Sequence, residues 1–158
     1  MLYVSHLYND VITPALKATD TYSESAGNLL LGTALIESRL TYLRQIKGCA
    51  LGLYQCEPET YTWLMEYLQR KPELTKKICT HCGFERLPCN DPDILIGNLS
   101  YATLIARVKY LTIPEALPEA DDTEAMALYY KKYYNTKHGK SDPRTYVRLY
   151  KEFSIDRT

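Results

Sequence analysis

The sequence predicts a mainly α protein built as a single domain. Its length of 158 residues suits one domain with one sizeable hydrophobic core. Apolar residues recur at the three- and four-residue spacing of helices along nearly the whole chain. The sequence contains no internal repeat, low-complexity tract or linker that would divide it. Residues 1–158 are therefore expected to form one unit.

The first two helices are predicted from apolar periodicity and capping residues. Four apolar residues share one face of the first helix: Leu7, Val11, Ala15 and Ala18. Pro14 interrupts this face, so the helix should be kinked or split. Ser23 and Ser25 are both suitable N-caps for a second helix over residues 27–40.

The middle of the chain is predicted to be less regular. Residues 41–58 contain Gly48 and Gly52 and alternate irregularly, so they are expected to form a loop or a small hairpin-like excursion. Pro58 can then open a helix that continues through residue 69. The segment 71–92, with three prolines and three cysteines, is predicted to be the least regular part of the chain.

Three further elements are expected in the last third of the chain. Asp91 and Pro92 signal the start of a helix over residues 93–110. Residues 113–118 are typical of an extended linker. Acidic residues then open a helix over 121–134, because negative charge is favoured near a helix N-terminus. A last helix is predicted over 143–153.

The overall charge and hydropathy exclude several kinds of partner. Nineteen basic and nineteen acidic residues give a net charge of zero, which provides no electrostatic reason to expect binding to nucleic acid. No apolar run reaches the roughly 18 residues of a spanning helix, so no membrane insertion is expected. The N-terminus, MLYVSHLYND, lacks the basic and apolar regions of a secretory signal. The protein is therefore expected to be made in a cytoplasm without a signal peptide.

The cysteines leave alternatives open. Five cysteines, an odd number, favour free thiols in a reducing compartment over a complete disulfide framework. Cys79 and Cys82 have the spacing of a zinc knuckle, with Cys89 nearby, but a structural zinc site usually takes two such pairs. Zinc, a disulfide and free thiols are therefore all considered for this segment. Cys49 and Cys56 form another pair that oxidising conditions would allow.

One carboxylate stands out on a very apolar helix. The stretch LLLGTALIESRL, residues 29–40, is apolar until Glu37 appears near its end. One interpretation is an ordinary helix-end carboxylate paired with Arg39 or Arg44. The other is a general acid, because burial favours the neutral carboxyl and raises its pKa towards neutrality. Cleavage of a glycosidic bond needs such an acid to protonate the leaving oxygen.

Two other stretches carry residue types suited to a sugar polymer. Glycine in the segment 52–55, GLYQ, lets backbone approach a ligand closely. Gln55 and Asn135 offer amides for hydroxyl and acetamido groups, and tyrosine rings offer faces for stacking. The chain has 15 tyrosines, of which four fall at 129, 130, 133 and 134. Half of these four are expected to pack in the core, and only Tyr134 is assigned a functional role.

At these residues the chain resembles the superfamily of goose-type lysozymes and soluble lytic transglycosylases, in particular its small phage-encoded members. That superfamily carries a Glu-Ser pair at a helix end, a Gly-Leu-Met-Gln loop, a Pro-x-Thr and a late Tyr-Asn pair. The corresponding stretches here occur in the same order: ALIES ending at Ser38, GLYQ at 52–55, PET at 58–60 and YYNT at 133–136. The resemblance spans about residues 28–150 and implies a lysozyme-like fold. Tyr54 in place of Met, and Thr136 and Lys137 in place of Ala-Gly, are departures from the pattern.

The resemblance also implies roles for single residues. Glu37 would protonate the bond between N-acetylmuramic acid and N-acetylglucosamine. It would then deprotonate the muramic acid's own primary hydroxyl, which closes an anhydro ring without water. Tyr134 would orient this carboxyl. The implied substrate-binding residues are Ser38, Gly52, Leu53, Tyr54, Gln55, Tyr134 and Asn135. No cofactor is implied.

Hydrolysis is the close alternative to transglycosylation. An inverting hydrolase needs a second carboxylate, and Glu57 holds the place of an Asp that goose-type enzymes carry after the loop. The Pro58-x-Thr60 stretch favours the transglycosylase branch.

Either enzyme would act on peptidoglycan glycan strands at a bacterial cell wall. It would reach them through a lysis pore or as a component of a phage virion. A rival hypothesis from another class is a virion structural or assembly protein that keeps a lysozyme-like fold for docking to other phage proteins.

Overall fold

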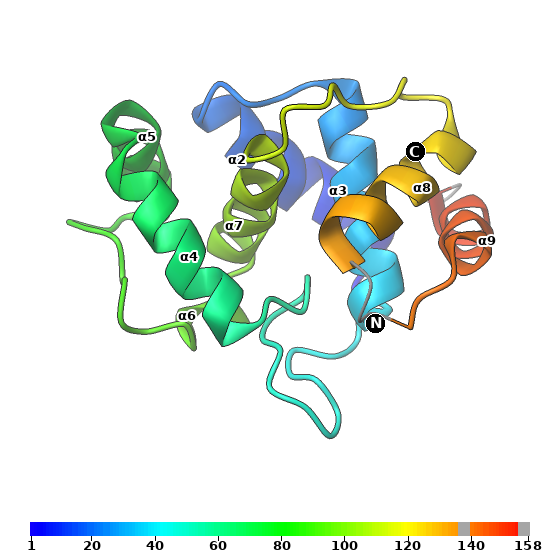
Figure 1. Ribbon diagram of the computed structural model, residues 1–158, viewed down its shortest axis with the longest axis horizontal. Helices are drawn as coiled ribbons and strands as arrows, with labels where there is room; N and C mark the ends of the chain where they lie inside the picture. The colour runs from blue at the N-terminus through cyan, green and yellow to red at the C-terminus, as the bar shows by residue number, and fades with distance from the viewer. Residues whose placement is uncertain (136–139, 155–158) are drawn as a thin grey trace.

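The computed structural model describes residues 1–135 and 140–154, and this part of the chain is mainly helical (Figure 1). In chain order its elements are α1 (Val4–His6), η1 (Leu7–Ile12), α2 (Thr13–Ala18), α3 (Glu24–Ser38), α4 (Pro58–Gln69), α5 (Pro72–Cys82), α6 (Ile94–Gly97), α7 (Leu99–Leu111), α8 (Thr123–Tyr130), η2 (Lys131–Asn135) and α9 (Pro143–Phe153). Here η marks a π-helical stretch. No β-strand forms within these residues, which confirms the mainly α prediction. None of the described helices is both long and apolar enough to cross a lipid bilayer.

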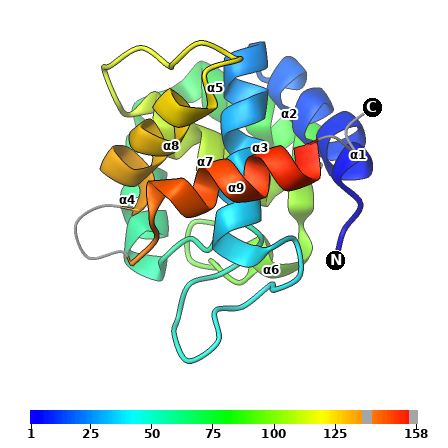
Figure 2. The same cartoon turned by 90° about the vertical axis from the view of Figure 1, so that its right-hand side faces the viewer.

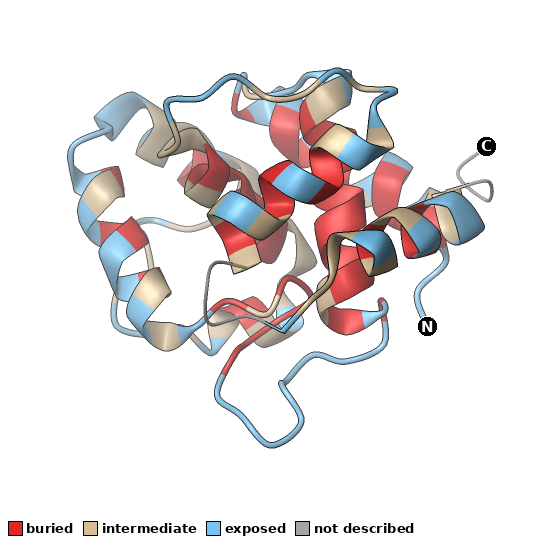
Figure 3. Cartoon of the chain, turned by 45° about the vertical axis from the view of Figure 1, so that its right-hand side comes forward, coloured by how far each residue is buried: buried red, intermediate tan, exposed pale blue. Residues whose placement is uncertain are grey.

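The core is built around α3. Figures 2 and 3 show α9 crossing this helix and buried residues along most of its length. Between residues 26 and 36 every side is covered by η1, α7, α8 and α9, so the helix is apolar all round rather than along one stripe. Gly32 is required where α9 crosses, because a Cβ there would collide with the ring of Tyr146. Thr33 keeps its hydroxyl satisfied by donating to the carbonyl of Leu29.

The N-terminal helix is continuous through Pro14. The expected interruption takes the form of the π-helical stretch η1, which precedes the proline, and not of a break. Pro14 cannot donate a backbone hydrogen bond and its ring crowds the carbonyl four residues earlier, so the preceding turns widen. At the next helix, the Ser23 hydroxyl accepts from the Ala26 N–H at 3.0 Å, which confirms Ser23 as the cap of α3. That helix ends at Ser38, where Arg39 adopts a left-handed conformation.

The excursion at residues 41–57 is a small hairpin-like loop, as predicted. Leu51 forms isolated bridges with Arg44 on one side and Cys56 on the other. The loop projects below α3 in Figure 1, and residues 41–49 are exposed. Gly52 has a φ of 78°, and a Cβ there would press on the carbonyl of Leu95, so only glycine fits. Helix α4 then begins at Pro58, as predicted.

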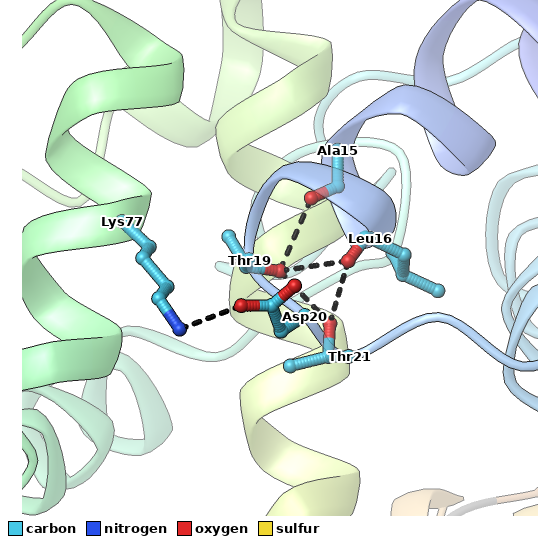
Figure 4. A network of polar contacts seen from close by, with 6 residues as sticks. All are labelled: Ala15, Leu16, Thr19, Asp20, Thr21 and Lys77. Atoms are coloured by element: carbon cyan, nitrogen blue, oxygen red, sulfur yellow. Dashed lines mark hydrogen bonds and ion pairs between the residues drawn. The ribbon is translucent and has the colours of Figure 1, made fainter.

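The prediction for residues 71–92 was wrong in its first half, because α5 occupies Pro72–Cys82. Pro72 lies in the first turn of this helix, where its missing N–H does no harm, so it starts the helix instead of breaking it. Ile78 and Cys79 face the core. The Lys77 ammonium lies 2.7 Å from the Asp20 carboxylate and joins α5 to the end of α2, as Figure 4 shows.

The helix predicted over 93–110 is divided in two. Asn98 leaves the helical conformation, and its side chain accepts a hydrogen bond from the Tyr101 N–H at 2.9 Å. It therefore caps α7, and α6 becomes a separate short turn. The last two predicted helices are confirmed. Asp122 caps α8, which continues into η2, and Asp142 caps α9.

Candidate functional site

A cleft of about 1100 Å³ opens where the end of α3 meets the excursion. Glu37 lies on its wall at the last turn of α3. The excursion and the start of α4 line one side, with Trp63 half exposed. Lys109 of α7 and the last residues of η2, Tyr134 and Asn135, line the other. Elements far apart in the sequence therefore meet around one carboxylate.

Glu37 is mostly buried and carries a perturbed pKa. Its carboxylate accepts a hydrogen bond from the Tyr130 hydroxyl at 3.0 Å. Burial raises the pKa of Glu37 from 4.5 to about 7, and the charge of Glu57 adds to that rise. The Tyr130 hydrogen bond and the charge of Lys109 act in the opposite direction. Among the described residues Glu37 forms no ion pair, so the pairing with Arg39 or Arg44 is not formed.

The tyrosine that contacts Glu37 is Tyr130, whereas the expectation was Tyr134. The Tyr134 hydroxyl instead donates to the carbonyl of Tyr54 at 2.7 Å. The two rings are stacked with centroids 5.9 Å apart, one turn from each other on the same side of the α8–η2 helix. Tyr134 still lines the cleft, and its hydroxyl fastens the 52–55 loop to η2.

Four of the proposed substrate-binding residues do not line the cleft: Ser38, Gly52, Leu53 and Tyr54. All four are buried. Ser38 donates to the carbonyl of Ala34 at 3.0 Å, and the Tyr54 hydroxyl is bonded to that of Thr103 at 2.8 Å. Ser38, Leu53 and Tyr54 bury their side chains in the core, and Gly52 packs its backbone against Leu95, so these residues support the walls of the cleft.

Gln55 and Asn135 do reach the cleft, as predicted. Gln55 adopts a left-handed conformation with φ 51°, and its amide nitrogen donates to the Gly52 carbonyl at 2.9 Å. The Asn135 side chain accepts from the Lys131 ammonium at 2.8 Å. The departures noted at residues 136 and 137 lie outside the described residues.

Glu57, the candidate second carboxylate, is exposed and lines the same cleft as Glu37. It accepts a hydrogen bond from the Cys49 thiol at 3.3 Å, and this contact raises the pKa of that thiol. Cys49 and Cys56 are both free thiols. The cleft thus holds the mostly buried carboxyl of Glu37 and two exposed carboxylates, Glu57 and Glu59.

The cysteine segment after α4 is not arranged as a metal site. Cys79, Cys82 and Cys89 are free thiols. Within the part of the chain that the structure describes, no three His, Cys, Asp or Glu side chains are grouped closely enough to hold a metal ion. Burial raises the pKa of Cys82 to about 11, so its thiol is protonated at neutral pH.

The sequence alone assigns no functional role to Trp63 and Lys109, which line the cleft, or to Tyr130, which is buried and contacts Glu37. Tyr130 precedes Tyr134 by four residues, the spacing of one helical face, and this signal was available. Trp63 is the single tryptophan and is 48% exposed, which is unusual for so large a ring. Lys109 is a cation near the end of a mainly apolar helix, as Glu37 is an anion near the end of α3.

No family model, curated protein or solved structure matches this chain. What the cleft does is therefore inferred from its own residues.

Proposed function

We propose that this protein has a lysozyme-like fold and cleaves peptidoglycan as a lytic transglycosylase, with Glu37 as its acid and then its base. The single observation that supports this most is the mostly buried Glu37 carboxyl on a cleft wall, whose pKa is raised to about 7. A carboxyl with that pKa is protonated in about half of the molecules at neutral pH and can both give and accept a proton.

The proposed reaction needs one carboxyl. Protonated Glu37 donates its proton to the oxygen between N-acetylmuramic acid and N-acetylglucosamine, and the bond from that oxygen to C1 of the muramic acid breaks. The resulting carboxylate then takes the proton from the muramic acid's C6 hydroxyl, whose oxygen bonds to C1. The products are an N-acetylglucosamine end and a 1,6-anhydro ring. No water is consumed, and Glu37 is protonated again.

The remaining cleft residues suit a glycan strand. The half-exposed rings of Trp63 and Tyr42 offer faces on which sugars can stack, and the amides of Gln55 and Asn135 offer hydrogen bonds. Tyr130 holds the Glu37 carboxyl through its hydroxyl, so the acid is positioned before substrate binds.

Hydrolysis is the second candidate, because Glu57 lines the same cleft. In an inverting hydrolase a second carboxylate about 6.5–9.5 Å from the acid activates a water. Glu57 would fill that role. Product analysis separates the two reactions: anhydro-muramic ends indicate transglycosylation, and reducing muramic ends indicate hydrolysis.

Digestion of purified sacculi tests the proposal. We expect wild-type protein to release soluble muropeptides and Glu37→Gln to be slower by about 100-fold or more. Glu59→Gln is the matched control, because Glu59 is an exposed carboxylate on the same cleft and should retain activity. If wild-type protein digests nothing, the enzyme proposal is wrong and a docking role in a phage virion replaces it. If Glu37→Gln stays fully active, the assigned acid is wrong.

A further inference from the structure

We propose that Lys109 is a positioning residue that places a fixed positive charge in the cleft it shares with Glu37 and ties the η2 segment to α7. Its use in catalysis rests on the proposed function above. Its contacts and its charge do not, and they can be measured on the protein alone.

Two contacts hold the Lys109 ammonium in place, and both are made with one residue. The ammonium donates to the carbonyl of Tyr134 at 2.9 Å. It also lies 3.9 Å from the centroid of the Tyr134 ring, over its face. Long flexible side chains lose rotamer freedom when held this way, and lysine is seldom buried without a partner. These two contacts therefore fix the position of the Lys109 ammonium in the folded protein.

Tyr134 connects Lys109 to the wall of the cleft. The Tyr134 hydroxyl donates to the carbonyl of Tyr54, whose loop ends at the cleft residue Gln55. Lys109 thus fixes the backbone of Tyr134, and Tyr134 fixes the loop. Removal of the ammonium would loosen both the contact between Lys109 and Tyr134 and the contact between Tyr134 and the loop.

Groups from several elements act on the charge of Glu37. Tyr130 of α8 donates a hydrogen bond to it, and Glu57 of the excursion repels its charge. Its negative charge also adds to the rise in the pKa of the buried Tyr110 and Tyr134 hydroxyls. Lys109 is the cation that acts on Glu37, and it is itself desolvated, which lowers its own pKa. A charge shielded from water acts over a longer distance than an exposed one.

The charge of Lys109 counteracts part of the effect that burial has on the pKa of Glu37. Desolvation makes Glu37 a weaker acid, since its carboxylate loses the stabilisation of water. A general acid works best when its pKa is near the working pH. Lys109 stabilises the carboxylate that remains once the proton has left, and therefore offsets part of the effect of burial.

A carboxyl titration of the substrate-free protein tests the proposal. Glu37 is labelled with ¹³C at its side-chain carboxyl and assigned by the signal that disappears in Glu37→Gln. In Lys109→Met, which keeps the length and removes the charge, we expect the pKa of Glu37 to rise by about one pH unit. Lys109→Arg should restore most of the wild-type value. Lys140→Met is the matched control, because Lys140 is an exposed cation on the same cleft, and it should leave the pKa unchanged.

A reciprocal measurement needs no substitution at Lys109. If the two charges are coupled, the loss of the Glu37 charge must lower the pKa of Lys109 by the same amount that the loss of the Lys109 charge raises the pKa of Glu37. We therefore expect the Lys109 ammonium, followed by ¹⁵N labelling, to titrate about one pH unit lower in Glu37→Gln. An unchanged Lys109 pKa in that variant overturns the proposal, whether or not Lys109→Met folds. So does an equal shift of Glu37 in Lys140→Met.

The activity readout separates the two proposals. If sacculi are digested, the rate profile of Lys109→Met should move to higher pH along with the pKa of Glu37, and Lys109→Arg should move it back. If sacculi are not digested by wild-type protein while the coupling is measured, the proposed reaction fails and the role of Lys109 stands.

Discussion

Replacement of Glu37 by glutamine should stabilise the protein at alkaline pH. The carboxyl titrates near its ordinary value of 4.5 when the chain is unfolded, and burial raises its pKa to about 7 in the folded protein. A raised pKa means that the folded state binds this proton more tightly than the unfolded state does. The stability that the protonated Glu37 contributes is therefore complete below pH 4.5 and is lost as the pH rises through 7. One pH unit corresponds to about 1.4 kcal/mol, so ionised Glu37 costs about 3 kcal/mol above pH 8.

Glutamine removes this penalty because it has the same shape, stays neutral and can still accept from the Tyr130 hydroxyl. Urea unfolding at pH 4 and at pH 8.5 measures the difference. We expect Glu37→Gln and wild type to be equally stable at pH 4, and the variant to gain about 3 kcal/mol at pH 8.5. For a chain of this size that gain raises the Tm by about 6–12 °C. Glu59→Gln, at an exposed position, is the control and should show no such dependence. If the gain in the free energy of unfolding of Glu37→Gln over wild type is equal at both pH values, or larger at pH 4, then burial does not raise the pKa of Glu37 as argued.

Two further predictions concern the surroundings of this carboxyl. Tyr130→Phe removes the hydrogen bond that lowers the pKa of Glu37, so we expect that pKa to rise further, measured by ¹³C titration; an unchanged value would exclude the contact. Gly32→Ala places a methyl group against the ring of Tyr146 and should destabilise the fold by about 1–3 kcal/mol in urea unfolding. Gly97→Ala is its control, because a Cβ there meets nothing within 4 Å, and equal losses in both variants would refute the packing argument.

Local signals were the easiest part of the structure to anticipate. Ser23 and Pro58 indicate helix starts by residue type, and α3 and α4 begin beside them. Capping works over three or four residues, so neighbouring sequence contains the information it needs. Pro72 is the exception: three prolines in residues 71–92 predict irregular structure, whereas Pro72 opens α5. The break at Asn98 was missed because the apolar pattern continues on both sides of it.

The composition of the cleft was anticipated only in part. Glu37, Gln55 and Asn135 reach it as expected, whereas Leu53 and Tyr54 are buried. The side chain that a loop residue presents to solvent depends on a backbone set by distant contacts, such as the one from Tyr134 to Tyr54. No local pattern in the sequence contains that contact.

The sequence by itself determined a helical chain with one carboxylate at the end of its most apolar helix. Charge on an otherwise apolar segment is a local signal, and burial of that segment follows from its composition. Only the tertiary structure decided which groups act on the carboxylate. Tyr130 rather than Tyr134 donates to Glu37, and the charge of Lys109 on α7 acts on the same carboxyl. Both follow from the turn of η2 and the packing of α7 beside it, which are set by contacts between residues far apart in the chain.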